Sequence, residues 1–452
     1  MDLTTAKKLI QKYEPIHSDF VWRADIARRY YDNQSDILYR KNRHADTDVR
    51  RADNRIPQNL YALLVDQKAS YLFTAPPVFD CGSEALNDRV AEVLGDEFQK
   101  ECRQLCVNAS NSGVGWVHYW QGEHGLEYAT VASEEILPVW SKGLKKQLLT
   151  VLRTYTDLDE ATGELLVIYE IWTPDEVAAF ARPAAETLDM LQEYFCFTEY
   201  DDWGNAEPVS VLRHGLGEVP FVAFYNNASH TSDLDKIKRL IDVQDAVFSG
   251  FVDDLEDIQE LILILTGYGG TDLSGFLDDL KRYKVIKMDA DEGSGLDTLK
   301  MEIPVEARKT LLDLVRKAIF EIGQGYDPHP ESFGNASGVA LKFMYASLEM
   351  KSGQQESEFR LGFARLVRAI CRAAGREPGR IIQTWTRTAI TNDLETAQIC
   401  QMSDGTISRR TILAHHPFVE DVDAEIEQLE AEKAEALARM DAYAGFGGGD
   451  GT

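Results

Sequence analysis

A run of carboxylates is the first feature of the chain that could do chemistry. The stretch DDLED, residues 253–257, holds four acidic side chains within five positions. Clustered carboxylates are ligands that Mg²⁺ accepts. The run lies in a helical pattern, however, and a helix spreads these side chains around much of its circumference instead of converging them. A divalent-cation site and a solvated acidic face are both open interpretations, and the spread favours the acidic face.

A second candidate is the small-residue stretch FGNASG, residues 333–338, directly before an apolar helical pattern. A phosphate-binding P-loop needs G-x-x-x-x-G-K-[ST]. Here Val339 follows the second glycine, and Lys342 comes a full turn later. The serine also stands one place too late for a G-x-S-x-G nucleophile elbow. Neither phosphate binding nor nucleophilic catalysis is indicated, so the stretch needs another explanation.

The histidines and cysteines do not form a metal or redox motif. None of the nine histidines has a metal-ligand spacing with carboxylates or cysteines. His415 and His416 precede a proline and favour a capping or loop pair, with a ligand pair as the alternative. His118 stands in an alternating strand pattern, which indicates a packed or surface residue more than a general base. Cys102 and Cys106, four apart on an expected helix, are interpreted as two buried thiols. We therefore expect no enzyme, no cofactor and no metal.

Composition limits the class of protein. The chain has 452 residues, 44% of them hydrophobic, with 47 Lys plus Arg against 75 Asp plus Glu and a net charge of −28. This acidity argues against a sequence-specific DNA-binding protein, which carries a basic footprint. The scattered cysteines indicate a reducing compartment. We expect no signal peptide, and no apolar run approaches the roughly 20 residues of a membrane span. We expect a soluble, intracellular chain with no membrane partner.

Periodicity predicts an α+β first domain over residues 1–231. Helical spacing dominates from 3 to about 75, where TAPP ends the pattern, and continues near 84–94 and 96–110. Segments rich in aromatic and β-branched residues follow, separated by turn residues. The sequence therefore predicts helices first and an antiparallel sheet second.

Beyond residue 231 the pattern becomes that of long helices. Ser232 is a plausible N-cap, and a narrow apolar stripe predicts a helix over 233–262, roughly 45 Å long. The further elements predicted are a small α/β insert (263–303), a helix (305–323), a loop (324–338), a third long helix (339 to about 374), short helices after Pro378 and an acidic helix (420–440). A stripe this narrow cannot bury a whole helix within one subunit, so we expect neighbouring subunits to cover it.

Four segments in this order resemble the portal proteins of tailed bacteriophages, the head-to-tail connector subunits, in the siphovirus group. They are NRIPQNLYALLVDQKASYLFTAPP (54–77), SDLDKIKRLIDVQDAVFSGFVDDLEDIQELILIL (232–265), FGNASGVALKFMYASLEMK (333–351) and GTISRRTILAHHPFVEDVDAEIEQLEAE (405–432). Thr74 and Ala75 depart from the pattern, because such sequences often place a glycine there. None of the four is a catalytic signature.

The resemblance implies an α+β portal fold divided into a wing, a stem, a clip and a crown. These parts map to an α+β wing (1–231, with the long helix 339–375), a two-helix stem (232–262 and 304–323), a small α/β clip (263–303), a tunnel loop (324–338) and a helical crown with a disordered tail (376–452). It also implies a homo-oligomeric ring, usually a dodecamer, at one capsid vertex. The protein would belong to the virion, and to the host cytoplasm during assembly.

The resemblance further assigns roles to particular residues. Those expected to face DNA from the tunnel loop are Asp327, His329, Glu331, Ser332, Asn335 and Ser337, with Gly325, Gly334 and Gly338 as hinges. Small residues and glycines suit a loop that presses on DNA in a narrow channel. The charges expected on the stem are Asp253, Asp254, Asp257, Lys309, Arg316 and Lys317, the three basic ones pairing with a neighbouring stem. The residues expected to contact partners from the clip are Tyr268, Lys281 and Arg282.

The implied partners are double-stranded DNA, which passes without sequence recognition, and several proteins of the virus. The proteins are the large terminase subunit, head-completion adaptors, and capsid and scaffolding proteins. Carboxylate-lined walls would keep the affinity for DNA low. Three alternatives stay open: an ordinary turn between helices at 324–338, an oligomeric helical scaffold without a channel, and a nuclease or hydrolase that uses the carboxylate clusters.

Overall fold

A computed structural model describes residues 1–41, 52–122, 125–160, 162–200, 203, 205–257, 262–266, 295–299, 304–328, 338–387, 393–419, 422 and 424–434. The chain divides into two compact units. Unit 1 comprises Met1–Asp327 and Leu348–Arg387, and unit 2 comprises Pro328–Ser347 and Thr388–Thr452. Most of the described residues, and all of the polar network analysed below, belong to unit 1.

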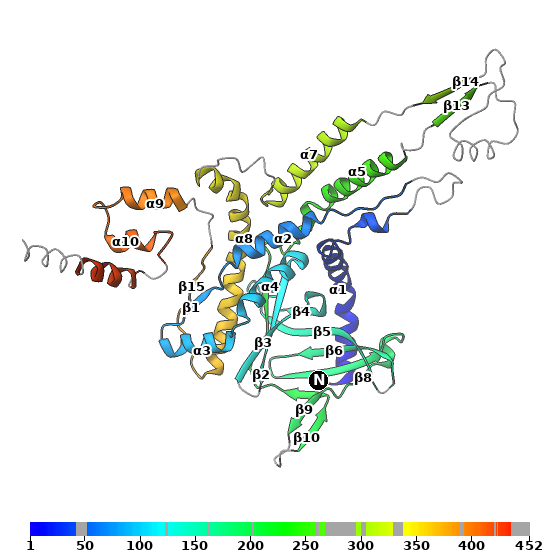
Figure 1. The fold of residues 1–452 in the computed structure, drawn as a ribbon. Coiled ribbons are helices and arrows are strands. Elements are labelled where there is room, and N and C mark those ends of the chain that lie inside the picture. Colours follow the sequence, from blue (N-terminus) through cyan, green and yellow to red (C-terminus); the bar gives the residue numbers. More distant parts are fainter. Residues whose placement is uncertain are drawn as a thin grey trace, which may run out of the picture. The chain divides into compact units, whose positions relative to one another are not determined.

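The first helices of unit 1 confirm the predicted periodicity. They are α1 (Leu3–Tyr31), α2 (Leu60–Leu72), α3 (Glu84–Leu94) and α4 (Phe98–Ser112), with the short 3-10 helix η1 (Asp36–Tyr39) after α1 (Figure 1). Helix α2 ends just before the predicted TAPP stop. Helix α4 ends at Gly113, whose φ of 80° suits glycine. A Cβ atom there would lie 2.4 Å from the carbonyl oxygen of His230, so glycine also permits a close approach of two backbones.

The strands between residues 114 and 225 form two antiparallel sheets and a separate hairpin, and the prediction of a single sheet is wrong. One sheet has the order β11-β7-β6-β5-β4 with β8 added at β7, the other is β12-β2-β3, and β9 pairs with β10. Their bounds are β2 (Val114–Gly122), β3 (Gly125–Val131), β4 (Ile136–Trp140), β5 (Leu148–Leu158), β6 (Leu165–Trp172), β7 (Glu176–Pro183), β8 (Gln192–Glu193), β9 (Phe197–Tyr200), β10 (Ala206–Val209), β11 (Val211–Arg213) and β12 (Phe221–Tyr225). The division arises because β12 returns to pair with β2, while β4 pairs with β5.

The largest core joins α2, α3 and α4 to the three-stranded sheet and to the long helix α8 (Gly338–Ala373). Aromatic rings fill its centre. Phe363 of α8 packs with Phe224 at a centroid distance of 4.9 Å and with Phe98 at 5.7 Å. Gly362 allows this contact, because a Cβ atom there would lie 2.5 Å from the Phe224 ring. Cys102 and Cys106 are buried free thiols in the same core, as predicted.

His118 lies between aromatic rings on β2, which confirms that it is packed. Its ring is 4.3 Å from the Phe221 ring and 4.5 Å from the Trp172 ring, centroid to centroid. One ring nitrogen lies 2.8 Å from the carbonyl oxygen of Pro220. Burial lowers the pKa of His118 to about 4, and the charges of Arg153 and His214 act in the same direction, against the Pro220 hydrogen bond.

We therefore expect acid to destabilise unit 1 through His118. The folded pKa of about 4 lies below the unfolded value of 6.5, so the neutral ring is favoured by folding. The stability contribution is complete above pH 6.5 and is lost as the pH falls towards about 4, where it levels off. A shift of this size corresponds to about 3 kcal/mol. Urea unfolding of the wild type and of His118→Phe between pH 4 and pH 7 measures it. A pH dependence that is the same in both proteins would contradict the assignment.

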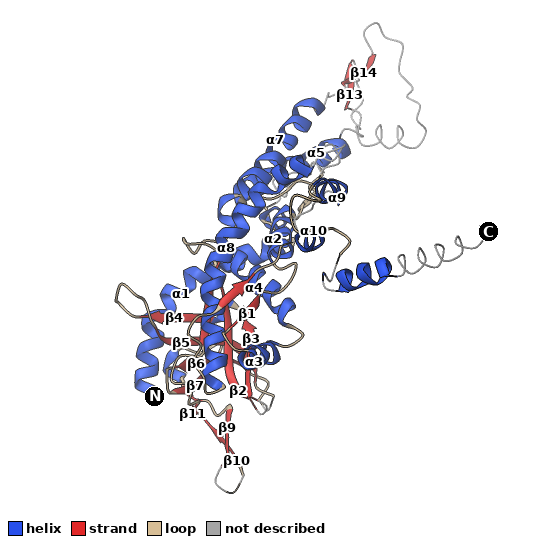
Figure 2. Cartoon of the chain, turned by 90° about the vertical axis from the view of Figure 1, so that its left-hand side faces the viewer, coloured by secondary structure: helices blue, strands red, loops and turns tan. Residues whose placement is uncertain are grey.

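Two long helices of unit 1, α5 (Lys238–Asp257) and α7 (Val305–Gly323), lie side by side in both views (Figures 1 and 2). The bounds predicted for α7 are confirmed. The helix predicted over 233–262 is too long, because a 3-10 turn, η4 (Leu234–Lys236), precedes α5 and strand β13 (Ile262–Thr266) already begins at Ile262. Strand β13 pairs antiparallel with β14 (Gly295–Leu299). The rest of the predicted insert lies outside the described residues.

Helix α8 confirms the third predicted helix. After it, strand β15 (Ile382–Thr384) pairs antiparallel with β1 (Val78–Asp80) within unit 1. Residues up to Arg387 belong to unit 1, and the crown boundary at 376 stays a prediction. Unit 2 contains the short helices α9 (Asp393–Met402) and α10 (Arg409–Ala414) and the helical residues 424–434. No helix among the described residues is long and apolar enough to cross a membrane.

Candidate functional site

Helix α7 buries one side against unit 1. Val315, Ile319 and Phe320 belong to a buried cluster that also contains Ile241 of α5 and Leu64 of α2. Their steps of four and one follow one side of a helix turning 3.6 residues per turn. The cluster packs the start of α5 and the C-terminal half of α7 against α2.

A second apolar stripe on α7 remains exposed in the described part of the chain. Its members are spaced by three or four residues and are Ala307, Leu311, Leu314, Ala318 and Ile322. The side chain of Leu314 is 60% exposed, and Leu311 and Ile322 are exposed as well. The packing against α2 and α5 covers the first apolar side of α7 and leaves this second side for another partner.

The basic residues predicted to pair with a neighbouring stem have different environments. Arg316 donates two hydrogen bonds to the carboxylate of Asp327, at 2.9 and 2.7 Å, and its guanidinium lies over the Phe320 ring. Lys317 lies 3.8 Å from Glu321 one turn later on the exposed surface. Lys309 is exposed. Arg316 thus has a partner within its own chain, Asp327, and pairing with a neighbouring stem stays a prediction.

Two of the three stem carboxylates bind within the chain. Asp254 forms an ion pair with Arg308 of α7. Asp253 accepts hydrogen bonds from the backbone N–H of Asn54 at 2.6 Å and from its side-chain amide at 2.9 Å. The side chain of Asp257 lies outside the described residues. The interpretation of 253–257 as a purely solvated face is therefore wrong at Asp253, which has a structural partner far away in the sequence.

Asp253 is the last of three acceptors that line one side of α5. Asp245 accepts from the backbone N–H of Gln58 at 3.1 Å, and Ser249 accepts from the backbone N–H of Ile56 at 3.0 Å. The acceptors are four residues apart and the donors two apart. Four helical residues rise about 6 Å, and two extended residues span about 6.6 Å. The two repeats therefore match, and the polar side of α5 holds the extended segment 54–58 by its backbone.

We expect Asp253→Ala to release the start of this segment. The substitution removes the acceptor of the backbone N–H of Asn54 and one of two acceptors of its side-chain amide, the other being Glu256 at 3.1 Å. The expected cost is roughly 1–3 kcal/mol. Hydrogen exchange followed by mass spectrometry should show faster exchange in residues 54–58. Asp254→Ala is the matched control, since it removes the neighbouring carboxylate and leaves the three acceptors intact. Equal exchange in the two variants would contradict the role of Asp253.

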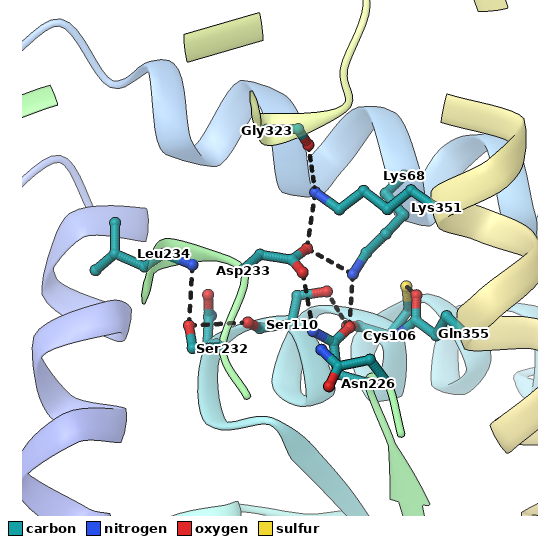
Figure 3. Close-up of polar contacts among 12 residues, drawn as sticks. Lys68, Cys106, Ser110, Asn226, Ser232, Asp233, Leu234, Gly323, Lys351 and Gln355 are labelled. Carbon is teal, nitrogen blue, oxygen red and sulfur yellow. Dashed lines mark hydrogen bonds and ion pairs between the residues drawn. The ribbon is translucent and has the colours of Figure 1, made fainter. Parts of the chain in front are cut away.

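A buried ion cluster joins the base of the α5–α7 pair to the rest of unit 1 (Figure 3). The carboxylate of Asp233, just before η4, accepts from the ammonium of Lys68 at 2.6 Å and lies 3.0 Å from that of Lys351. Lys68 also donates to the side-chain oxygen of Asn226 at 2.7 Å, and Lys351 donates to the carbonyl oxygen of Gly323 at 2.8 Å. The cluster thus connects α2, the end of β12, the turn before α5, the end of α7 and α8.

The cluster is nearly inaccessible to solvent. The side chain of Lys68 is 1% exposed, that of Asp233 is 9% exposed and that of Lys351 is 11% exposed. Burial alone would raise the pKa of the Asp233 carboxyl, but the ammonium groups of Lys351 and Lys68 outweigh it and hold the pKa well below its usual range. Burial lowers the pKa of Lys351. Asp233 is therefore ionised at neutral pH.

Hydrogen bonds of hydroxyl groups stabilise the turn that carries Asp233. Ser232 accepts from the backbone N–H of Leu234 at 3.1 Å and donates to the carbonyl oxygen of Ser110 at 3.2 Å. The residue predicted as an N-cap therefore holds the turn before η4, whose own N-cap residue is Asp233, and α5 begins only at Lys238. Tyr61 of α2 donates to Asn111 at 2.9 Å beside this turn.

The predicted hinge Gly325 packs tightly in this structure. A Cβ atom at Gly325 would lie 2.0 Å from a methyl carbon of Leu64, and one at Gly323 would lie 2.8 Å from the other methyl carbon. Glycine at 325 is thus explained by the close approach of the chain to α2. Gln324 between them adopts φ 55° and ends α7. A hinge motion at Gly325 stays a prediction.

Many predicted site residues lie outside the described part of the chain. These are His329, Glu331, Ser332, Gly334, Asn335 and Ser337 of the tunnel loop and Tyr268, Lys281 and Arg282 of the clip. Gly338 is the first residue of α8. The roles predicted for all of them stay predictions. Among the described residues no group of three or more His, Cys, Asp or Glu side chains could hold a metal ion.

The ion cluster is not predicted from the sequence, although one signal for it exists. Lys68 occupies the apolar side of α2, at helical spacing from Tyr61, Leu64 and Leu72. A lysine in that position needs a buried partner, because an unpaired ammonium is costly in an apolar core. The partner itself could not be identified, because Asp233 is 165 residues away in the sequence.

Comparisons with known proteins cover nearly the whole chain. A family model described as "Phage portal protein, SPP1 Gp6-like" matches residues 10–438. A portal protein of Clostridium phage phiCD119 is 41% identical over 456 aligned positions, which cover 95% of this chain and 98% of that protein. A portal protein of Bacillus phage SPP1 is 29% identical and covers 95% of this chain and 86% of that protein. One solved structure, "Virion of native gene transfer agent (GTA) particle", matches 78% of this chain and 87% of its own at 12% identity, with a TM-score of 0.42.

Proposed function

The chain belongs to the SPP1 Gp6-like phage portal proteins, and from this premise we propose that its copies form a ring at one capsid vertex through which DNA enters and leaves. In this proposal the α5–α7 pair is the stem, residues 263–303 are the clip and residues 324–338 are the tunnel loop. The protein is a structural component of the virion, and we assign it no catalytic step.

The observation that supports a ring best is the second apolar face of α7. Ala307, Leu311, Leu314, Ala318 and Ile322 form a stripe along one side of the helix, opposite much of its charge. Burying a leucine stabilises an interface by roughly 1.5–3 kcal/mol. In a closed ring each subunit presents such a stripe to the next one, and every copy of it is covered.

The acidity of the chain fits a passage for DNA. Twelve subunits of charge −28 would carry a charge on the order of −300 before counterions are considered. DNA binds tightly where lysine and arginine neutralise its phosphates and release counterions. On the described part of α7, Arg308 pairs with Asp254, Arg316 with Asp327 and Lys317 with Glu321, which leaves the exposed Lys309 without an ion pair among the described residues. A wall of this kind repels the backbone of DNA and lets it slide.

The protein partners follow from the same proposal. The clip would bind the large terminase subunit while the capsid is filled and head-completion adaptors afterwards. The wing, formed by the two sheets and α8, would contact capsid and scaffolding proteins. Pull-down of the purified terminase subunit by the wild type, but not by a variant in which residues 267–294 are replaced by a short glycine-serine linker, tests the first contact.

Electron microscopy of the purified full-length protein tests the proposed ring directly. We expect closed rings with a central hole in negative stain, and a cryo-EM map with residues 324–338 at the hole. Discrete monomers would contradict the ring. Closed oligomers without a hole would instead support the alternative of a helical scaffold.

The proposal also predicts how the ring binds DNA. We expect weak binding that is independent of sequence and that decreases steeply with salt, since phosphate contacts dominate it. Filter binding with two duplexes of unrelated sequence between 50 and 200 mM salt, roughly the range over which such contacts lose most of their affinity, measures this. Tight binding at physiological salt, or a preference for one sequence, would count against a conduit.

A further inference from the structure

The charges of the buried ion cluster do not balance. Two ammonium groups, Lys68 and Lys351, contact a single carboxylate, Asp233. All three side chains are almost completely removed from water, where an uncompensated charge is costly. The exposed Lys236 of η4 also lies at this place, and the exposed Asp235 next to it in the sequence offsets its charge.

Neighbouring side chains do not supply the missing negative charge. The thiol of Cys106 is buried beside the cluster, and burial raises its pKa to about 11, so it is neutral. Burial also raises the pKa of the Tyr61 phenol well above its ordinary value. Among the described residues, Asp233 is thus the anion in contact with both lysines.

A small cavity of ≈ 20 Å³ lies directly beside this charge. Its lining includes Lys68, Asp233, Lys351, Lys236, Gln324 and Gln354. A volume of this size holds one water-sized particle and excludes anything as large as a sugar acid. Ammonium and amide groups, which donate hydrogen bonds, predominate among these side chains.

Each of the two buried lysines also has one N–H bond that is not used in the cluster. An ammonium group carries three N–H bonds. Lys68 uses two of them, towards Asn226 and Asp233, and Lys351 uses two, towards Gly323 and Asp233. One N–H of each lysine thus has no acceptor among the described residues.

We propose that this cavity is a binding site for a monatomic anion, chloride in solution, held by the ammonium groups of Lys68 and Lys351. The anion neutralises the excess charge and accepts the remaining N–H of each lysine. Its two ligands come from α2 and α8, and Asp233 and Gly323 place the start of α5 and the end of α7 against them. Binding of the anion therefore requires α2, α8, the start of α5 and the end of α7 to be in position. The anion thus stabilises the attachment of the α5–α7 pair to α2 and α8.

Thermal unfolding of the full-length protein in sodium chloride and in sodium gluconate at equal concentrations tests the site. Gluconate is too large for the cavity. We expect the wild type to unfold at a higher temperature in chloride, by roughly 2–4 °C, with an effect that saturates as a single site fills. Lys351→Met should lose the difference between the two salts. Lys317→Met, which removes an exposed lysine of α7, should keep it.

A second measurement does not depend on how well the variant folds. Crystals of the wild type grown in sodium bromide should show an anomalous difference peak at the bromine absorption edge in contact with both ammonium nitrogens. Absence of this peak, or equal unfolding temperatures of the wild type in the two salts, would overturn the proposal. Either outcome would show that the two lysines bind no halide ion, and neither would bear on whether the protein forms a ring.

Discussion

Asp233→Asn is expected to destabilise the protein by roughly 3–5 kcal/mol. The substitution keeps the size of the side chain and removes its charge, so Lys68 and Lys351 are left buried without their carboxylate. Removing one partner of a buried ion pair has a cost of this order, because an uncompensated charge remains in a medium of low dielectric constant. Urea unfolding followed by tryptophan fluorescence measures the loss.

The control for this prediction is Asp235→Asn. Asp235 lies two residues further on, in the exposed part of η4, and its substitution should change the stability by less than about 0.5 kcal/mol. The deficit of Asp233→Asn should also persist from pH 5 to pH 8. Because the pKa of Asp233 is held far below the unfolded value of about 3.9, its contribution is complete above that value and is lost only in strong acid. Similar stabilities of the two variants would show that the ion cluster does not hold the base of the helix pair.

Leu311→Asp combined with Leu314→Asp is expected to prevent assembly of the ring. Each leucine would contribute roughly 1.5–3 kcal/mol to a subunit interface. The loss of both corresponds to a decrease in affinity of roughly 10²–10⁴-fold at each contact. A carboxylate in either position adds the cost of removing a charge from water. Mass photometry of the purified proteins should show rings for the wild type and single subunits for the variant.

A matched control separates the loss of apolar area from the change in charge. Lys309→Gln combined with Lys317→Gln changes the net charge by the same two units on another side of α7. This variant should still assemble even if Lys309 and Lys317 pair with a neighbouring stem, because an exposed ion pair contributes at most about 1 kcal/mol. Circular dichroism of both should match the wild type, because all four side chains are exposed. Rings formed by the aspartate variant would show that the stripe of α7 is not a subunit interface.

The parts of the fold that could be predicted from the sequence are those that local patterns determine. Helix α7 begins after Pro304 and ends at Gly323, and both bounds follow from its periodicity and its flanking residues. The predicted start of α5 is too early. Ser232 accepts from the N–H of Leu234 in a turn that leads into η4, and α5 begins only at Lys238.

The parts that could not be predicted depend on contacts between distant segments. The strands form two sheets instead of one because β12 pairs with β2, about a hundred residues earlier in the chain. The alternation of apolar and polar residues does not show which strands pair. The prediction that Asp253 faces solvent is wrong for the same reason, a contact between distant segments. Its partner, Asn54, lies 199 residues away, in a stretch without secondary structure.

The match between α5 and the segment 54–58 constrains how the chain can change in length. Because donors on an extended chain alternate in direction, inserting a single residue between Asn54 and Gln58 would turn one or more N–H groups away from the helix. Inserting two residues would restore the direction but displace the chain by one acceptor. We therefore expect the length of this segment to be fixed. Homologous chains should tolerate exchange of its side chains far more readily than any gain or loss of residues.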